Sequence, residues 1–176
     1  MSDFDTPGHE DFDNDGLDDH AITADYGDHS TTAVDTDYNG DAEGVYEDDN
    51  NDGVQDHLYL DGDGNGTIDS EAFDNNHDGY ADTIVSDFNH DGSVDQVSED
   101  TNHDGVVDAV AIDADQDGNL DTYAEDVNHD GVADEMILDR DGDGIADATL
   151  TDTDGDGAID QVVYGDASVS ANPYAS

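Results

Sequence analysis

The 176-residue sequence contains no cysteine, no tryptophan, two prolines and one basic side chain, Arg140, against 51 acidic ones. Without cysteine, neither a disulfide nor a thiolate metal site can form. No hydrophobic run approaches the roughly 18 residues of a membrane-spanning helix, so we expect no direct membrane insertion. The formal net charge of −50 argues against nucleic acid and anionic membranes as partners and leaves cationic surfaces as candidates.

A chain of this charge, with 33% hydrophobic and 7% aromatic residues, should repel itself and resist compaction. Two simple interpretations are intrinsic disorder and a generally acidic surface of the kind that salt-adapted proteins carry. Neither interpretation requires the acidic side chains to keep a register along the chain, whereas here they do.

Ten acidic loops of nine residues recur at a strict interval of thirteen residues, each with glycine at its sixth position. In Asp113–Asp121 oxygen-bearing side chains occupy positions 1, 3, 5 and 9. Position 1 is Asp in all ten loops, position 3 is Asp or Asn, and position 9 is Asp except for Glu43. The ten glycines are Gly40, Gly53, Gly66, Gly79, Gly92, Gly105, Gly118, Gly131, Gly144 and Gly157.

This pattern predicts calcium binding, because Ca²⁺ takes about six to eight hard oxygen ligands and a glycine allows the loop to curl around the ion. The carbonyl of position 7 is expected to add a ligand. An eleventh loop, Asp11–Asp19, is out of phase with the others, so we expect ten to eleven Ca²⁺ sites. The predicted metal ligands are Asp11, Asp13, Asp15, Leu17, Asp19, Asp35, Asp37, Asn39, Asp41, Glu43, Asp48, Asn50, Asp52, Val54, Asp56, Asp61, Asp63, Asn65, Thr67, Asp69, Asp74, Asn76, Asp78, Tyr80, Asp82, Asp87, Asn89, Asp91, Ser93, Asp95, Asp100, Asn102, Asp104, Val106, Asp108, Asp113, Asp115, Asp117, Asn119, Asp121, Asp126, Asn128, Asp130, Val132, Asp134, Asp139, Asp141, Asp143, Ile145, Asp147, Asp152, Asp154, Asp156, Ala158 and Asp160.

Three segments follow from the register of these loops. Residues 1–34 form an N-terminal segment with the out-of-phase loop and weak strand character over Ala21–Val34. Residues 35–164 are the ten-repeat array, and residues 165–176 have the composition of a linker or tail.

The four residues between successive loops are too few for a helix and predict short strands instead. A longer period is also present, because residues 99–124 match residues 125–150 at 13 of 26 positions. We therefore predict an all-β fold, a calcium-stapled elongated β-solenoid with about 26 residues and two loops per coil. The alternative is an irregular wire of chain wrapped around calcium.

The array resembles the thrombospondin type 3 repeat, whose units are Asp-rich, close to this length and wrapped around calcium; this chain lacks the cysteines of that family. Loops such as Asp87–Asp95 also resemble the calcium loops of FG-GAP repeats, in which position 9 is a ligand and a strand follows directly. The EF-hand is less similar, because its twelfth-position Glu is replaced by residues such as Val85 and Ala111. Both close resemblances imply calcium as the bound ion.

Histidine occupies position 4 of four loops, and three of these residues are 26 apart: His77, His103 and His129, with His90 as the fourth. The simpler interpretation is a solvent-facing side chain at a tolerant position. The alternative is a ladder that binds a transition metal or senses pH. No nucleophile motif, phosphate loop or catalytic triad is found in the sequence, so we do not expect an enzyme.

We expect an extracellular or cell-surface protein with a structural or adhesive role, and a candidate subunit of a calcium-stabilised filament. Loops without the twelfth-position Glu should bind Ca²⁺ in the range of about 10⁻⁴–10⁻³ M that is typical of extracellular modules. End-to-end self-association would use residues 1–34 and 165–176, the segments outside the array. The alternative is a soluble, high-capacity binding or storage protein for calcium or another hard cation.

Overall fold

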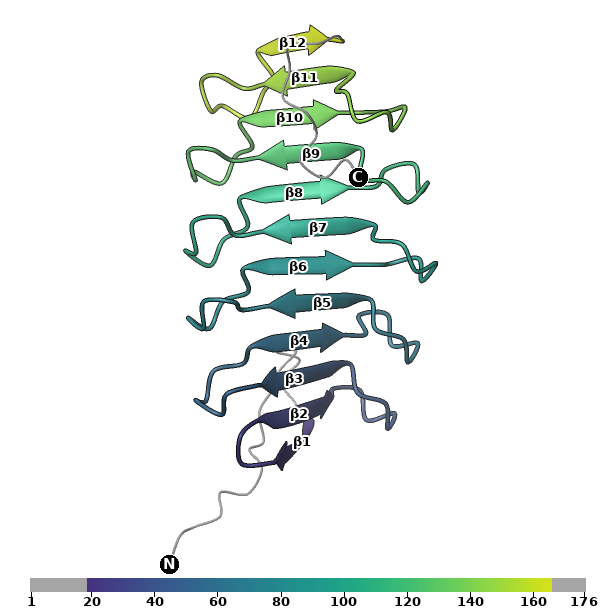
Figure 1. The fold of residues 1–176 in the computed structure, drawn as a ribbon, viewed down its shortest axis with the longest axis vertical. Coiled ribbons are helices and arrows are strands. Elements are labelled where there is room, and N and C mark those ends of the chain that lie inside the picture. The colour runs from purple at the N-terminus through teal and green to yellow at the C-terminus, as the bar shows by residue number, and fades with distance from the viewer. Residues whose placement is uncertain (1–18, 166–176) are drawn as a thin grey trace, which may run out of the picture. The chain divides into compact units, whose positions relative to one another are not determined.

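The computed structural model describes residues 19–165, and this part of the chain contains β-strands and no helix (Figure 1). The predicted all-β fold is confirmed. None of the described residues forms a helix that could cross a membrane. The strands are β1 (His20–Asp25), β2 (Ser30–Asp35), β3 (Gly44–Asp48), β4 (His57–Leu60), β5 (Ser70–Phe73), β6 (Thr83–Ser86), β7 (Gln96–Glu99), β8 (Ala109–Ile112), β9 (Thr122–Glu125), β10 (Glu135–Leu138), β11 (Ala148–Thr151) and β12 (Gln161–Tyr164).

The chain divides into two compact units between Ala81 and Asp82, inside the loop that follows β5. We call them the N-terminal unit, which contains β1–β5, and the C-terminal unit, which contains β6–β12. Within each unit every strand pairs with its sequence neighbour in an antiparallel ladder, so each unit is a meander.

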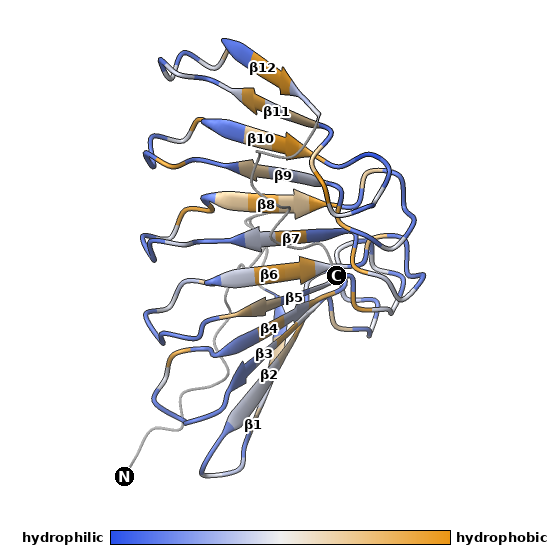
Figure 2. Cartoon of the chain, turned by 45° about the horizontal axis from the view of Figure 1, so that its top comes forward, coloured by the Kyte–Doolittle hydropathy of each residue, from blue (hydrophilic) through white to orange (hydrophobic). Residues whose placement is uncertain are grey.

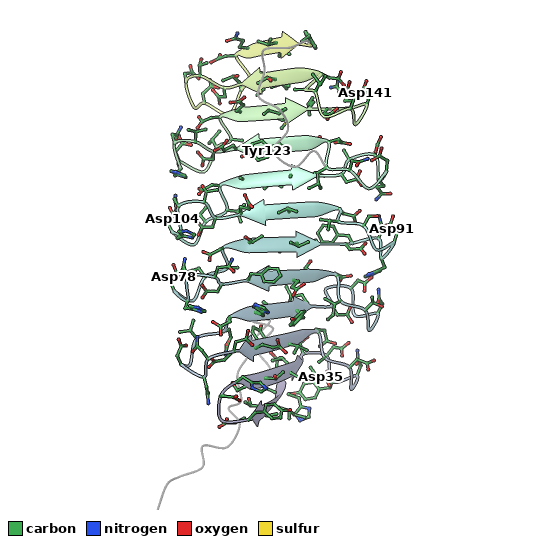
Figure 3. The ribbon with its side chains drawn as sticks, viewed as in Figure 1. Asp35, Asp78, Asp91, Asp104, Tyr123 and Asp141 are labelled. Atoms are coloured by element: carbon green, nitrogen blue, oxygen red, sulfur yellow. The ribbon has the colours of Figure 1, made fainter. Side chains whose placement is uncertain are left out.

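Each thirteen-residue repeat contributes one strand and one loop, and the chain reverses direction at every loop. The loops of the C-terminal unit therefore alternate between two edges of its sheet (Figure 1). Asp104 lies at one edge, whereas Asp91 and Asp141 lie at the other, with Tyr123 on the strands between them (Figure 3). The direction of the chain repeats every 26 residues, as predicted, and the two strands of one period lie side by side in the same sheet.

The strands are rich in Val, Ile, Thr and Tyr, which suit an extended backbone, and the loops are hydrophilic (Figure 2). Directly paired residues share a face, so Ala111, Tyr123 and Ile137 lie on one face of the C-terminal sheet. Among the described residues, the buried hydrophobic side chains are mostly alanines, including Ala109 and Ala111, each 1% exposed. The sheets therefore bury little apolar surface.

The weak strand character of Ala21–Val34 corresponds to the hairpin β1–β2, whose turn is closed by a backbone hydrogen bond from Tyr26 N–H to His29 O of 3.0 Å. Strand β2 pairs in turn with β3, so the hairpin continues the sheet of the N-terminal unit, and Val34 is 2% exposed there. The first strands of this unit thus precede the array that starts at residue 35.

Candidate metal centres

The ten acidic loops share one backbone conformation. The sixth-position glycines all have positive φ, for example 94° at Gly118 and 88° at Gly131. Position 4 is left-handed in all ten loops as well, with φ of 62° at Gln116 and 59° at His129. The positive φ at position 6 explains why glycine is required there. Position 4 has a similar restriction on φ, which the sequence did not reveal.

Backbone N–H groups hold the first and fifth side chains inside each loop. In all ten loops the glycine N–H donates to the Oδ2 of the first-position Asp at 2.6–3.0 Å. In all ten the seventh-position N–H donates to the Oδ1 of the fifth residue at 2.7–3.0 Å. The loop orients these oxygens without any help from the rest of the chain.

The ninth-position carboxylate closes the loop from the other side. Asp108 is 5% exposed, and its Oδ2 accepts hydrogen bonds from Thr101 N–H at 3.1 Å and Thr101 Oγ1 at 2.9 Å. Burial opposes ionisation of Asp108, but the hydrogen bonds from His129 and Thr101 lower its pKa. Hydrogen bonds from the Thr153 hydroxyl and backbone likewise lower the pKa of Asp160. Both groups are therefore held as carboxylates.

Four loops bring three carboxylates together, with one oxygen of each within 4.8 Å of the others. One loop belongs to the N-terminal unit and three to the C-terminal unit, and all four have Asp at position 3. The loops at 48–56, 74–82, 87–95, 100–108 and 126–134 have Asn at position 3, which supplies a neutral amide oxygen instead. The clusters are Asp35, Asp37 and Glu43; Asp113, Asp115 and Asp121; Asp139, Asp141 and Asp143; and Asp152, Asp154 and Asp160.

These clusters fit a hard cation by a second observation. Asp139 is 2% exposed, yet its Oδ1 has no hydrogen-bond donor among the described residues. The buried Asp35 Oδ1 and Glu43 Oε1 also lack a donor within residues 19–165. Burying a carboxylate oxygen without a hydrogen-bond donor costs free energy. Coordination to a cation such as Ca²⁺ would compensate this cost. The donor set is entirely oxygen, as calcium prefers.

Three of the position-4 histidines are solvent-facing, as the simpler interpretation expects, with the side chains of His77, His103 and His129 48%, 52% and 37% exposed, but each of them also contacts a buried carboxylate. His103 Nδ1 lies 2.6 Å from Asp82 Oδ1, and His129 Nδ1 lies 2.7 Å from Asp108 Oδ1. In the N-terminal unit His77 makes the same contact with Asp56. These hydrogen bonds raise the pKa of His77 and His129. Each links a loop to the ninth-position Asp 21 residues earlier, a spacing that the sequence contains but that only the sheet register explains.

Of the out-of-phase loop, Asp19 is 5% exposed, whereas Asp11, Asp13, Asp15 and Leu17 lie outside the described residues.

Comparison of the chain with protein-family models, with curated proteins and with solved structures finds no match.

Proposed function

We propose that this chain is a calcium-stabilised repeat protein, in which an ion in each acidic loop supplies folding free energy that the thin core does not. The observation that carries the proposal is Asp139, a buried carboxylate whose Oδ1 lacks a donor among the described residues, within a cluster of three carboxylates. Burying such groups at a net charge of −50 opposes folding unless a cation compensates them. Binding free energy then becomes folding free energy.

The proposed ion is Ca²⁺, bound once per loop, in ten to eleven sites. Carboxylate, amide and carbonyl oxygens suit calcium, and a flexible loop suits its variable coordination number better than the octahedral geometry that Mg²⁺ demands. Cytosolic calcium, well below the range of about 10⁻⁴–10⁻³ M expected for such loops, would leave them empty. We therefore place the protein outside the cell or on its surface.

The proposed role is structural or adhesive. Eleven Ca²⁺ ions would reduce the formal charge of −50 by 22, to about −28, so lateral contacts between copies are disfavoured and end-to-end contacts through residues 1–34 and 165–176 are favoured. Strand β12 (Gln161–Tyr164) is exposed along its whole length, with Tyr164 75% exposed. An open edge of this kind is a template for pairing with another strand.

The direct test is metal removal from the full chain. In EDTA at low salt we expect an expanded chain that has lost its β-sheet circular dichroism, and in millimolar Ca²⁺ we expect a compact, β-rich protein. High NaCl in EDTA is the matched control, because it screens repulsion without filling the loops. Recovery of the fold in NaCl alone would refute calcium-dependent folding, and a calorimetric stoichiometry of only two or three Ca²⁺ ions would refute one ion per loop.

Self-association tests the structural role separately from calcium binding. Light scattering and electron microscopy in millimolar Ca²⁺ should show polymers that grow with protein concentration. Deletion of residues 165–176 should shorten or abolish them while the calcium stoichiometry stays unchanged. A calcium-loaded chain that remains monomeric at high concentration would favour the alternative of a soluble, high-capacity calcium store.

A further inference from the structure

Asp108 is held by two different loops of the C-terminal unit. Its Oδ2 accepts hydrogen bonds from Thr101 of its own loop, whereas its Oδ1 accepts a hydrogen bond from His129 Nδ1 at 2.7 Å. The loop of His129, residues 126–134, is the next one along the same edge of the sheet. The oxygen of Asp108 that its own loop leaves free is thus positioned by its neighbour.

His129 stands between two predicted ligands of its own loop. Its φ of 59° is restricted, and it separates Asn128 from Asp130. Asn128 Nδ2 donates to Asp134 Oδ1 at 3.0 Å, and Gly131 N–H donates to Asp126 Oδ2 at 2.7 Å. Holding the imidazole against Asp108 therefore orders the segment that carries the third and fifth positions of loop 126–134.

The opposite edge of the same unit supplies a natural comparison. Both edges have a backbone hydrogen bond between neighbouring loops, from Asp126 N–H to Asp108 O at 2.8 Å and from Asp139 N–H to Asp121 O at 2.8 Å. Position 4 is His129 at the first edge and Gly142 at the second. Between these two pairs of loops, the His129 side-chain link is thus added to the first pair on top of a backbone contact that both pairs share.

We propose that His129 is a positioning residue that couples neighbouring calcium sites, so that an ion in loop 100–108 stabilises the ion-binding form of loop 126–134. This inference rests on the proposed function and adds communication between sites to it. An ion that fixes Asp108 also fixes the acceptor for His129, so the second loop loses less conformational entropy when it binds its own ion. The coupling is reciprocal by linkage. His103, which donates to Asp82, is the equivalent residue one period earlier.

The test measures how an empty loop affects its neighbour in the full chain at saturating Ca²⁺. Asp104→Ala removes the predicted ligand at position 5 of loop 100–108. Asp117→Ala removes the predicted ligand at position 5 of loop 113–121, which lies at the opposite edge. NMR hydrogen exchange is then followed at the amides of Gly131 and Gly144, which are bonded to Asp126 and Asp139. Each substitution is made with and without His129→Asn. Asn is accommodated at this loop position, because Asn51 has φ of 57° there.

With His129 present, Asp104→Ala should speed exchange at Gly131 about fivefold or more, the lower end of common coupling energies. Asp117→Ala should change exchange at Gly144 much less. His129→Asn should reduce the effect of Asp104→Ala on Gly131 to that smaller level. A purely structural imidazole would speed exchange at Gly131 by itself but leave the effect of Asp104→Ala unchanged, and this result would overturn the coupling. If exchange at Gly131 is the same in EDTA and in Ca²⁺, calcium binding itself fails and the coupling fails with it.

Discussion

Loops 100–108 and 126–134 of the C-terminal unit differ from loops 113–121 and 139–147 in two linked ways. The first pair has Asn followed by a histidine at positions 3 and 4, whereas the second pair has Asp followed by Gln116 or Gly142. Both pairs keep the same positive φ at positions 4 and 6 and the same hydrogen bonds to the first and fifth side chains. The two pairs therefore share one backbone conformation and differ in the charge of the third side chain and in the type of the fourth.

The difference indicates two ways to arrange the acidic side chains of a loop. In the second pair, three carboxylates lie together in each loop, which raises the demand for a cation. In the first pair, one carboxylate is replaced by an amide, and the ninth-position carboxylate of loop 100–108 gains a donor from the next loop. We infer that the first kind of loop depends less on its ion to remain ordered and the second kind depends on it more.

The largest effect should come from the scaffold that both kinds of loop share. Gly131→Val and Gly144→Val force a β-branched residue to adopt φ near 88° and 82°, respectively. Apart from Gly131 and its two chain neighbours, no atom of residues 19–165 lies within 4 Å of a Cβ built on Gly131, so the cost there is conformational rather than steric. We expect each substitution to destabilise the calcium-bound protein by about 1–3 kcal/mol, measured by urea unfolding in Ca²⁺. A large difference between the two variants would mean that the loops do not share one scaffold.

A smaller effect should follow from exchanging the third-position residues. Asp141→Asn should weaken calcium binding in loop 139–147 because it removes a charge, and Asn128→Asp should strengthen it in loop 126–134. A change of about tenfold in affinity, which corresponds to about 1.4 kcal/mol, is expected for each. Without calcium, Asn128→Asp should instead destabilise its loop, because it replaces the bond from Asn128 Nδ2 to Asp134 with repulsion. Competition with a calibrated chelator measures both affinities, and equal affinities in parent and variants would contradict the assigned role of position 3.

The fold could be predicted from the sequence because the signal repeats. Thirteen residues leave room for only one short strand between loops, and the 26-residue similarity identifies the alternation of the edges. The loop scaffold was also accessible, since the spacing of Asp113, Asp115 and Gly118 imposes it locally.

The links between loops could not be predicted, because they depend on the register of strands that are two repeats apart. The contact of His129 with Asp108 spans 21 residues, and it requires both loops to lie at one edge of the sheet. The left-handed conformation at position 4 was hidden as well, since Tyr38, Asn51 and Gln116 occupy it beside histidine and glycine. Its variable occupants resemble those of an unrestricted position.

The smallest effect should come from the threonine at the second position of a loop, which donates to the ninth-position carboxylate: Thr101 to Asp108, and Thr153 to Asp160. The Thr101 hydroxyl donates to Asp108 at 2.9 Å and the Thr153 hydroxyl donates to Asp160 at 2.5 Å, but within the described part of the chain only Asp108 of the two also has a histidine donor. Because these hydrogen bonds lower each pKa below the usual 3.8, the stability they contribute is present above about pH 4 and is lost as the pH falls through the lowered pKa. Thr153→Val should raise the pKa of Asp160, and Thr101→Val should raise that of Asp108 by less, since His129 remains. Carboxyl ¹³C titration by NMR at fixed Ca²⁺ measures both, and a larger rise at Asp108 would show that the imidazole does not hold this carboxylate.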